Sequence, residues 1–157
     1  MKPGTFTQMY VQLVFAVQDR DNILSKNIRP RIFEYISGII KTFGHKSIIV
    51  NGVSDHIHIL LGLNPAISIS DTVHDIKRGS SIFINQNRLV QGRFSWQAGY
   101  GGFTYSRSQI EEVYNYIENQ EYHHSKRTFQ EEYIDILEKN NVEYDPKFLF
   151  DFFDLSL

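Results

Sequence analysis

Hydrophobic positions in the first third of the chain change their period, and the change predicts a strand followed by a helix. Residues 7–17 are rich in β-branched and aromatic side chains and contain no glycine or proline, which is typical of a strand. From Arg31 to Phe43 the apolar residues recur every three or four positions, which indicates an amphipathic helix. Gly44 stands where a helix commonly ends, because glycine readily adopts the left-handed conformation of a C-terminal cap.

The following segment predicts a hairpin and a second helix. Residues 47–50 and 53–63 have the composition of strands, and Asn51-Gly52 between them is a strong signal for a tight turn. Residues 67–89 follow helical spacing, with a serine near the start to serve as the N-cap. The two strands and the second helix therefore follow the strand and helix predicted for the first segment.

An aromatic, glycine-rich stretch and a capping signal come next. Residues 94–103 predict a fourth strand that runs into a flexible joint at Gly101-Gly102. Ser108 and Glu111 have the spacing of a capping box, which predicts a helix that continues to about Glu121.

The C-terminal part predicts one more helix and an apolar tail. Thr128 and Glu131 repeat the capping-box spacing, so we expect a helix over residues 128–140. Residues 148–153 contain four phenylalanines, and we expect this aromatic tail to dock against the protein in preference to stacking on bases.

The order of these elements predicts the fold class. Strand, helix, strand, strand, helix and strand in succession form the split βαβ pattern of ferredoxin-like (βαββαβ, RRM-like) α+β folds, an antiparallel sheet with two helices on one face. We expect a single domain over residues 1–157, with the ferredoxin-like core in residues 1–103 and C-terminal helices in residues 104–157. Fold alone says nothing about function.

Composition removes several classes of chemistry. The 157 residues are 41% hydrophobic and 22% charged, which supports a packed core instead of disorder. The chain has no cysteine, so disulfides, thiolate zinc sites, iron–sulfur clusters and cysteine nucleophiles are excluded. No apolar run approaches the ~20 residues of a membrane span, and we expect a soluble cytoplasmic protein that makes no contact with a membrane.

Charge divides the chain into a basic and an acidic part. Residues 1–110 carry twelve Lys/Arg against six Asp/Glu, whereas residues 111–157 carry four against twelve. Such a division indicates either a nucleic-acid-facing part beside an acidic one or two ordinary solvated surfaces. Because the formal net charge is −2, any nucleic acid has to be held by a local basic patch.

Two histidines on the third predicted strand are the strongest chemical signal. Side chains two positions apart on a strand point to the same face, so His56 and His58 project together while Ile57, Ile59 and Leu61 point into the core. Two neutral imidazoles side by side are half of a metal site. The alternative is a pair of ordinary histidines, but placing both on a central strand is costly without a partner.

A metal site needs a third ligand, which without cysteine is a carboxylate, an amide oxygen or another histidine. Gln120 and His123-His124 are candidates. Asp55 precedes His56, and by alternation along the strand we expect it to point to the other face as a turn or salt-bridge residue.

A phenol and an amide share one predicted helix. Tyr116 and Gln120 are four residues apart and therefore lie on the same helix face. A phenol next to a metal-bound histidine pair is suited to phosphoryl transfer, the amide oxygen completing the metal shell and the phenol acting as the nucleophile. Tyr114, Tyr122 and Tyr133 are rival phenols, and packing is the alternative role for any of them.

The chain resembles the single-tyrosine HUH transposases of the 200/605 group of bacterial insertion sequences. The HUH motif is two histidines around a hydrophobic residue, and the other matching segments occur in the family's order over nearly the whole chain. The segments that carry the resemblance are residues 53–60 with the HUH motif, the basic residues 77–81, the Trp-Gln-Ala-Gly segment at 96–103, the tyrosine region 116–120, His123-His124 and residues 128–133.

The resemblance implies a ferredoxin-like homodimer that acts on single-stranded DNA with hairpin-marked ends. His56, His58 and Gln120 would hold a divalent metal, Mg²⁺ or Mn²⁺, and Tyr116 would form a 5′-phosphotyrosine link during cleavage and rejoining. In this family the tyrosine helix of one subunit can complete the site of the other. A domesticated REP-associated tyrosine transposase would share the same motifs.

DNA contacts are predicted from the basic residues of the second helix and the segment after it. The arginines and the lysine would meet phosphates, and Trp96 or the nearby Phe94 would stack on a base. For each of them a solvated charge or a core aromatic is the alternative. The predicted contact residues are Lys77, Arg78, Arg88, Arg93 and Trp96.

A different class of function stays open at this point. A ferredoxin-like nucleic-acid-binding module with an incidental histidine pair would bind DNA or RNA without cutting it. A bacterial transposase would act in the cytoplasm, at the nucleoid. The two classes differ in whether Tyr116 forms a covalent bond to DNA.

Overall fold

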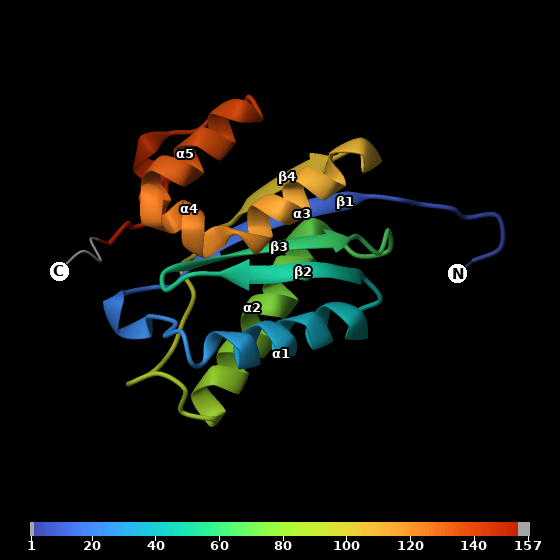
Figure 1. Ribbon diagram of the computed structural model, residues 1–157. Helices are drawn as coiled ribbons and strands as arrows, with labels where there is room; N and C mark the ends of the chain where they lie inside the picture. Colours follow the sequence, from blue (N-terminus) through green and yellow to red (C-terminus); the bar gives the residue numbers. More distant parts are fainter. Residues whose placement is uncertain (1, 154–157) are drawn as a thin grey trace.

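The computed structural model describes residues 2–153, and its centre is a four-stranded antiparallel sheet. The strand order is β2-β3-β1-β4, with β1 paired to β3 on one side and to β4 on the other. This order and the βαββαβ connection confirm the predicted ferredoxin-like α+β fold (Figure 1). The strands are β1 (Tyr10–Ala16), β2 (Lys46–Gly52), β3 (His56–Gly62) and β4 (Gly101–Tyr105).

Helices cover both faces of the sheet. Two of them, α1 (Arg29–Thr42) and α2 (Ile69–Gln86), lie on one face, as the sequence predicts. Three C-terminal helices lie on the other face, above the central strands in Figure 1. They are α3 (Ile110–Glu118), α4 (Gln120–Lys126) and α5 (Phe129–Lys139). Short 3-10 turns over Arg20–Asn22, Arg107–Gln109 and Pro146–Phe148 complete the elements.

The main core lies between the sheet and the first helix pair. Ile57, Ile59 and Leu61 of β3 are buried there, as predicted from alternation, together with Ile36 of α1 and Ile76 of α2. Because these side chains use one face of β3, the alternate residues face α3–α5. The two histidines of β3 therefore lie under the C-terminal helices.

The hairpin turn is not where the sequence places it. Asn51 and Gly52 belong to β2 and pair with His58 and Ile57, so the tight turn falls at residues 53–55. Asn51 instead donates through Nδ2 to the carbonyls of Ile117 (2.9 Å) and Glu118. A long-range role of the asparagine at the end of α3 explains why a local turn signal is misleading here.

The fourth strand is shorter and later than predicted. Residues 94–100 form an extended segment in which Trp96 makes a single bridge to Val17, and regular pairing begins at Gly101. Lys77 of α2 holds this segment by donating to the carbonyls of Gln97 and Gly99. The segment is therefore held both by α2 and by the residues at the end of β1, where Gln97 N–H donates to the carbonyl of Ala16.

The predicted helix over residues 108–121 is broken. Its capping box is formed by Ser106 and Gln109, and α3 ends at Glu118. Asn119 separates α3 from α4, and the two helices run in different directions in Figure 1. Tyr116 and Gln120 consequently lie on two consecutive helices, which removes the premise that they share one helix face.

The last predicted helix and the tail agree with the sequence analysis. α5 begins after Thr128, whose capping box with Glu131 is present. Phe150 is buried against Phe129 and Tyr133, so the tail docks as expected, whereas Phe148 is 84% exposed. Within residues 2–153 no helix combines the length and the apolar character that crossing a membrane requires.

Candidate active site

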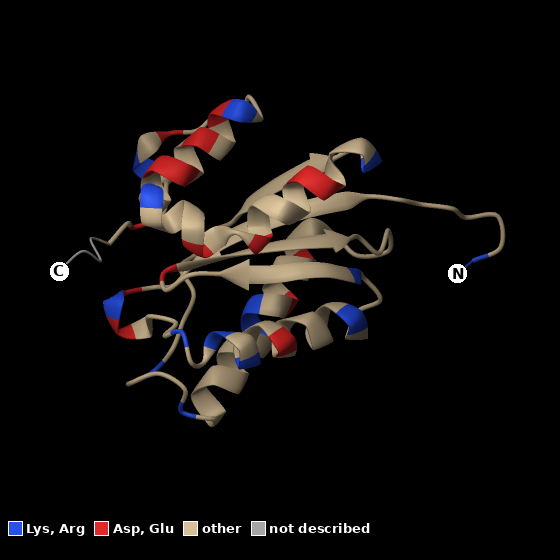
Figure 2. Cartoon of the chain, in the orientation of Figure 1, with Lys and Arg blue, Asp and Glu red and all other residues tan. Residues whose placement is uncertain are grey.

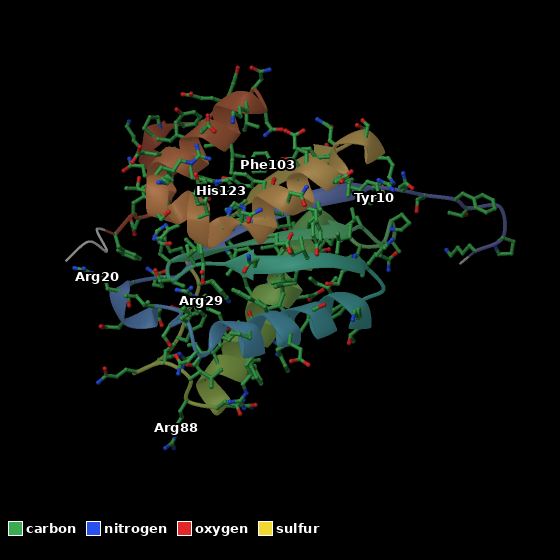
Figure 3. The ribbon with its side chains drawn as sticks, in the orientation of Figure 1. Tyr10, Arg20, Arg29, Arg88, Phe103 and His123 are labelled. Atoms are coloured by element: carbon green, nitrogen blue, oxygen red, sulfur yellow. The ribbon has the colours of Figure 1, made fainter. Side chains whose placement is uncertain are left out.

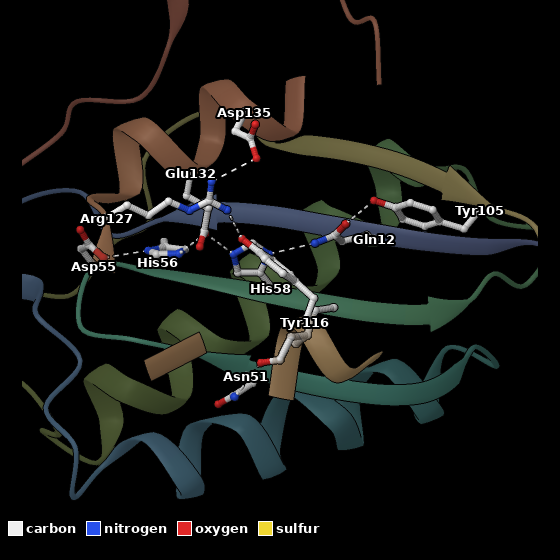
Figure 4. A network of polar contacts seen from close by, with 11 residues as sticks. Gln12, Asn51, Asp55, His56, His58, Tyr105, Tyr116, Arg127, Glu132 and Asp135 are labelled. Carbon is white, nitrogen blue, oxygen red and sulfur yellow. Dashed lines mark hydrogen bonds and ion pairs between the residues drawn. The ribbon is translucent and has the colours of Figure 1, made fainter. Parts of the chain in front are cut away.

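His56 and His58 converge on one carboxylate oxygen. Their Nε2 atoms lie 3.0 Å and 2.8 Å from Oε1 of Glu132, which α5 brings down onto β3 (Figure 4). Both imidazoles are fully buried and Glu132 is 1% exposed. Two nitrogens and one carboxylate oxygen within 4.8 Å of one another form a group that could hold a metal ion.

Each histidine has a second partner through Nδ1. Asp55 Oδ1 lies 2.8 Å from Nδ1 of His56, and Gln12 Nε2 lies 3.0 Å from Nδ1 of His58. Tyr105 in turn donates to Gln12 Oε1 at 2.6 Å. Such outer partners fix the orientation of imidazole ligands. Asp55 lies in the turn, so strand alternation does not apply to it, and its carboxylate contacts the site instead of pointing away.

The electrostatics of the group are those of an internal ion pair. Burial disfavours a charge on His56, but the hydrogen bonds to Asp55 and Glu132 outweigh it and raise the pKa of His56 to about 9. Burial lowers the pKa of His58. Burial also opposes the charge of Glu132, yet the two histidines hold its pKa well below the usual range. At neutral pH the protein therefore pairs a Glu132 carboxylate with a protonated His56.

Phe129 closes the site from the side of α5. Its ring stacks on His56 with centroids 3.7 Å apart and 8° between the planes. Phe129 and Glu132 are three residues apart on α5 and therefore share the helix face that meets the sheet. One helical turn thus delivers both an apolar cover and a carboxylate to the histidine pair.

Tyr116 lies beside the histidine pair of its own chain. Its ring centroid is 6.0 Å from that of His58, and His123 stacks on its other side at 4.4 Å. The phenolic oxygen accepts a hydrogen bond of 3.0 Å from Arg127. Burial and the Glu132 carboxylate raise the pKa of the phenol, and the Arg127 cation partly opposes them.

Gln120 is buried, but its side chain makes no hydrogen bond to His56, His58 or Glu132. Within residues 2–153, neither atom of its side-chain amide has a hydrogen-bond partner. A buried amide without a hydrogen-bond partner is costly, and an ordered water or a bound ion would satisfy it. The role predicted for Gln120 as a metal ligand therefore stays a prediction.

Sequence reasoning did not single out Glu132. A carboxylate was among the possible third ligands, but Glu132 is 74 residues from His58, and its helix carries several acidic residues. The available signal was its i+3 spacing from Phe129, the first residue of the helix. Only the docking of α5 on β3 distinguishes Glu132 from its neighbours.

The predicted DNA-contact residues lie away from this site. Trp96 is buried, donates to Ser80 Oγ and packs edge-on against Phe15 and Phe94, so it is a core residue and does not stack on a base here. Phe94 is buried as well. Packing against the sheet explains both corrections, because the 94–100 segment covers the end of the core.

The basic residues of this set differ among themselves. Lys77 is bound to two backbone carbonyls, and burial lowers its pKa to about 8. Arg78, Arg88 and Arg93 are exposed on the side of α2, and Figure 3 shows Arg88 far below the sheet. These three stay candidates for DNA contact, whereas Lys77 has a structural role.

Charge is segregated between the two faces. Asp and Glu recur along α3 and α5 above the sheet, whereas most Lys and Arg lie on α1, α2 and the segments beside them (Figure 2). The basic and acidic parts of the sequence therefore become opposite sides of the molecule. The histidine site lies on the acidic side.

Comparisons with known proteins decide the family. Residues 5–120 match the model of the family described as "Transposase IS200 like". The chain belongs to the IS200-like transposase family. It is 25% identical over 122 residues to the ISDra2 transposase TnpA of Deinococcus radiodurans, a match that covers 74% of this chain and 87% of the relative. Membership makes the protein a DNA-processing enzyme of transposition, and the predicted resemblance is confirmed.

Two solved structures share the fold of this transposase. A candidate transposase from Deinococcus radiodurans superposes with a TM-score of 0.59 at 25% identity, covering 76% of this chain and 96% of the other. A REP-associated tyrosine transposase bound to a REP hairpin superposes with a TM-score of 0.56 at 12% identity and covers 99% of this chain and 96% of that one. The second neighbour therefore spans the C-terminal helices as well.

Proposed function

We propose that the protein cleaves and rejoins single-stranded DNA at hairpin-marked ends, with Tyr116 as the nucleophile. The observation that carries the proposal is the position of the Tyr116 ring beside His58, under helices that exclude water from the histidine pair. The family match covers Tyr116 and both histidines, which supports the assignment. The relative bound to a REP hairpin supports single-stranded hairpin DNA as the substrate class.

The donor set fits a divalent metal. His56, His58 and Glu132 would hold Mg²⁺ or Mn²⁺, and Mn²⁺ tolerates imidazole better. The unpaired amide of Gln120 would supply a further oxygen ligand after a movement of α4. When bound, the metal supplies Lewis-acid polarisation of a phosphate oxygen. Asp55 and Gln12 would keep the imidazoles oriented.

The reaction is an exchange of phosphate esters. The phenolic oxygen of Tyr116 attacks the scissile phosphorus, the bond from phosphorus to the 3′ oxygen breaks, and a 5′-phosphotyrosine link forms. The proton lost by Tyr116 is balanced by the proton gained by the departing 3′ oxygen. In the reverse direction a 3′ hydroxyl attacks the phosphotyrosine and restores the phenol. Because one phosphate ester replaces another of similar energy, no nucleoside triphosphate is consumed.

We also propose a homodimer, as the resemblance implies. Within one chain the Tyr116 ring already lies next to His58, so the tyrosine helix can serve the site of its own subunit. In the alternative arrangement, which the resemblance implies, the tyrosine helix would serve the site of the partner subunit. A break at Asn119 gives the joint at which α3 and α4 would separate for such an exchange.

A REP-associated nuclease is the second candidate. The neighbour with a REP hairpin covers 99% of this chain, including the three C-terminal helices, whereas the Deinococcus structure covers 76%. That difference favours a REP-like relative over a minimal insertion-sequence enzyme. Hairpins from repeated extragenic palindromes and hairpins from element ends, offered separately, distinguish the two.

The test is covalent capture of DNA. The full chain is incubated with Mn²⁺ and end-labelled single-stranded hairpins of both kinds, and the products are separated under denaturing conditions. We expect a labelled protein adduct in the wild type and none in Tyr116→Phe. Tyr114→Phe, which removes a neighbouring phenol, serves as the matched control and retains the adduct. DNA binding without any adduct would support a non-catalytic module instead.

A further inference from the structure

The guanidinium of Arg127 lies within hydrogen-bond distance of the phenolic oxygen of Tyr116. One Nη of Arg127 donates to the Tyr116 hydroxyl at 3.0 Å, and the other donates to Asp135 Oδ2 at 3.0 Å (Figure 4). Asp135 also pairs with Lys139 at 3.0 Å, so it is held from two sides. Arginine carries five N–H donors, and these two bonds leave donors available for another oxygen ligand.

Arg127 lines two cavities. One, of about 270 Å³, opens between β4, α3 and α5 and is lined by Tyr105, Glu112, Tyr116 and Arg127. The other, of about 690 Å³, opens beside Asp55 and the start of α5 and is also lined by Arg127. DNA that enters either cavity would come close to the Arg127 guanidinium, and in the smaller cavity it would also come close to Tyr116.

The charges around the phenol make a cation at this point necessary. Glu132 and Glu112 face the Tyr116 region from α5 and α3, and Asp135 lies behind Arg127. His58 and His123 contact the ring of Tyr116. A phosphodiester that reaches this acidic side of the protein would be repelled unless a positive group meets it. The Arg127 side chain is 27% exposed, which leaves it accessible from the cavities.

We propose that Arg127 is a catalytic residue that binds a non-bridging oxygen of the scissile phosphate and holds the phosphorus in line with the Tyr116 oxygen. This inference rests on the proposed function. As the bond from the phenolic oxygen to phosphorus forms and the bond to the 3′ oxygen breaks, the guanidinium stays on the phosphate and stabilises the charge on its oxygens. Asp135 is the positioning residue, because its hydrogen bond fixes the orientation of the Arg127 guanidinium.

The test compares three variants of the full chain. Arg127→Gln removes the positive charge and the planar guanidinium, whereas Arg127→Lys keeps the charge but not the planar set of N–H donors. Lys147→Gln removes one positive charge from an exposed residue that lines neither cavity, and it is the matched control. Single-turnover adduct formation is measured at saturating hairpin DNA with Mn²⁺, together with the Kd for DNA.

The expected result is a loss in rate with little loss in binding. Removing one preorganised donor to a transition-state oxygen typically costs about 10²-fold in rate, so we expect Arg127→Gln to lose about 10²-fold. The rate of Arg127→Lys should fall between those of the wild type and Arg127→Gln, and the rate of Lys147→Gln should stay within about twofold of the wild type. A rate for Arg127→Gln within about twofold of the wild type would overturn the inference while leaving Tyr116 as the nucleophile.

A second arm does not depend on cleavage. The dinucleotide TpT, which contains one phosphodiester, is titrated into the Mg²⁺-loaded chain while the Arg127 side-chain signals are followed by NMR, with Arg127→Lys used for assignment. We expect saturable shifts of the Arg127 signals in the wild type and in Tyr116→Phe. If no adduct forms but these shifts occur, the proposed function fails and the phosphate site stands. Unmoved Arg127 signals would contradict the phosphate site.

Discussion

Phe129 lies flat on His56, with 3.7 Å between the ring centroids and 8° between the ring planes. The stack joins the first residue of α5 to the first residue of β3, 73 positions apart in the sequence. Phe150 of the tail also packs against Phe129, with 5.8 Å between the ring centroids. An apolar contact chain therefore runs from the tail through α5 to a histidine of the site.

Replacement of Phe129 should destabilise the protein and loosen the site together. A buried Phe→Ala change typically costs about 3–5 kcal/mol, because it leaves a cavity that relaxes only in part. We expect Phe129→Ala to lower the free energy of unfolding by that amount in urea denaturation. Phe148→Ala is the matched control: its ring is 84% exposed, so a change of more than about 0.5 kcal/mol there would argue against burial as the cause.

Glu132 should decide metal affinity. Its Oε1 contacts both imidazoles, so Glu132→Gln removes the charge that balances a divalent cation while keeping the size of the side chain. We expect the affinity for Mn²⁺, measured by calorimetry or by EPR of the free ion, to fall at least about 10-fold. Glu138→Gln changes the same charge on an exposed position of the same helix and should leave the affinity unchanged. Equal affinities in both variants would exclude Glu132 as a ligand.

Stability of the metal-free protein should fall as the pH rises. The pKa of His56 is raised from 6.5 to about 9 in the folded chain, so its contribution is complete below pH 6.5 and is lost as the pH rises through 9. A shift of this size corresponds to ~3 kcal/mol. We expect the free energy of unfolding, measured in EDTA, to decrease over this range.

Added Mn²⁺ should change that pH dependence. The metal binds neutral imidazole, so its stabilisation grows as His56 loses its proton, and the decrease between pH 6.5 and 9 should shrink or reverse. Glu132→Gln should flatten the metal-free profile, because one of the groups that raise the pKa of His56 is gone. A profile that rises with pH in EDTA would contradict the ion pair.

The end of β2 should tolerate no side chain at Gly52. A Cβ at that position would collide with the backbone carbonyl of His56 and with Ile57, so we expect Gly52→Ala to destabilise the fold and weaken Mn²⁺ binding. Gly38 lies within α1, and of the described residues none comes within 4 Å of a Cβ built there. Gly38→Ala should therefore stabilise the helix by about 0.5–1 kcal/mol, as measured by thermal denaturation.

Local patterns predicted most of the fold, because the period of apolar residues is set by the element itself. The strand at 7–17, the helix ending before Gly44 and the helix after Thr128 agree with β1, α1 and α5. The errors occur where a distant partner overrides a local signal. Asn51-Gly52 is a turn dipeptide by itself, but Asn51 is used at the end of α3, 66 residues away.

The site was predictable only in part for the same reason. The histidine pair follows from strand alternation. Tyr116 was selected by its spacing of four residues from Gln120, although the break at Asn119 removes that premise, and by the resemblance. Glu132 and Arg127 depend on how α4 and α5 fold back over β3, which the spacing of residues does not encode. The break at Asn119 likewise falls inside a segment whose composition favours one continuous helix.

The most direct test of the central claim is to identify the residue that carries DNA. The wild-type chain is reacted with Mn²⁺ and single-stranded hairpin DNA, the adduct is digested with nuclease and protease, and the peptides are sequenced by mass spectrometry. We predict a nucleotide linked through a 5′ phosphate to the tyrosine at position 116. A linkage at Tyr114, Tyr122 or Tyr133, with Tyr116 unmodified, would contradict the account.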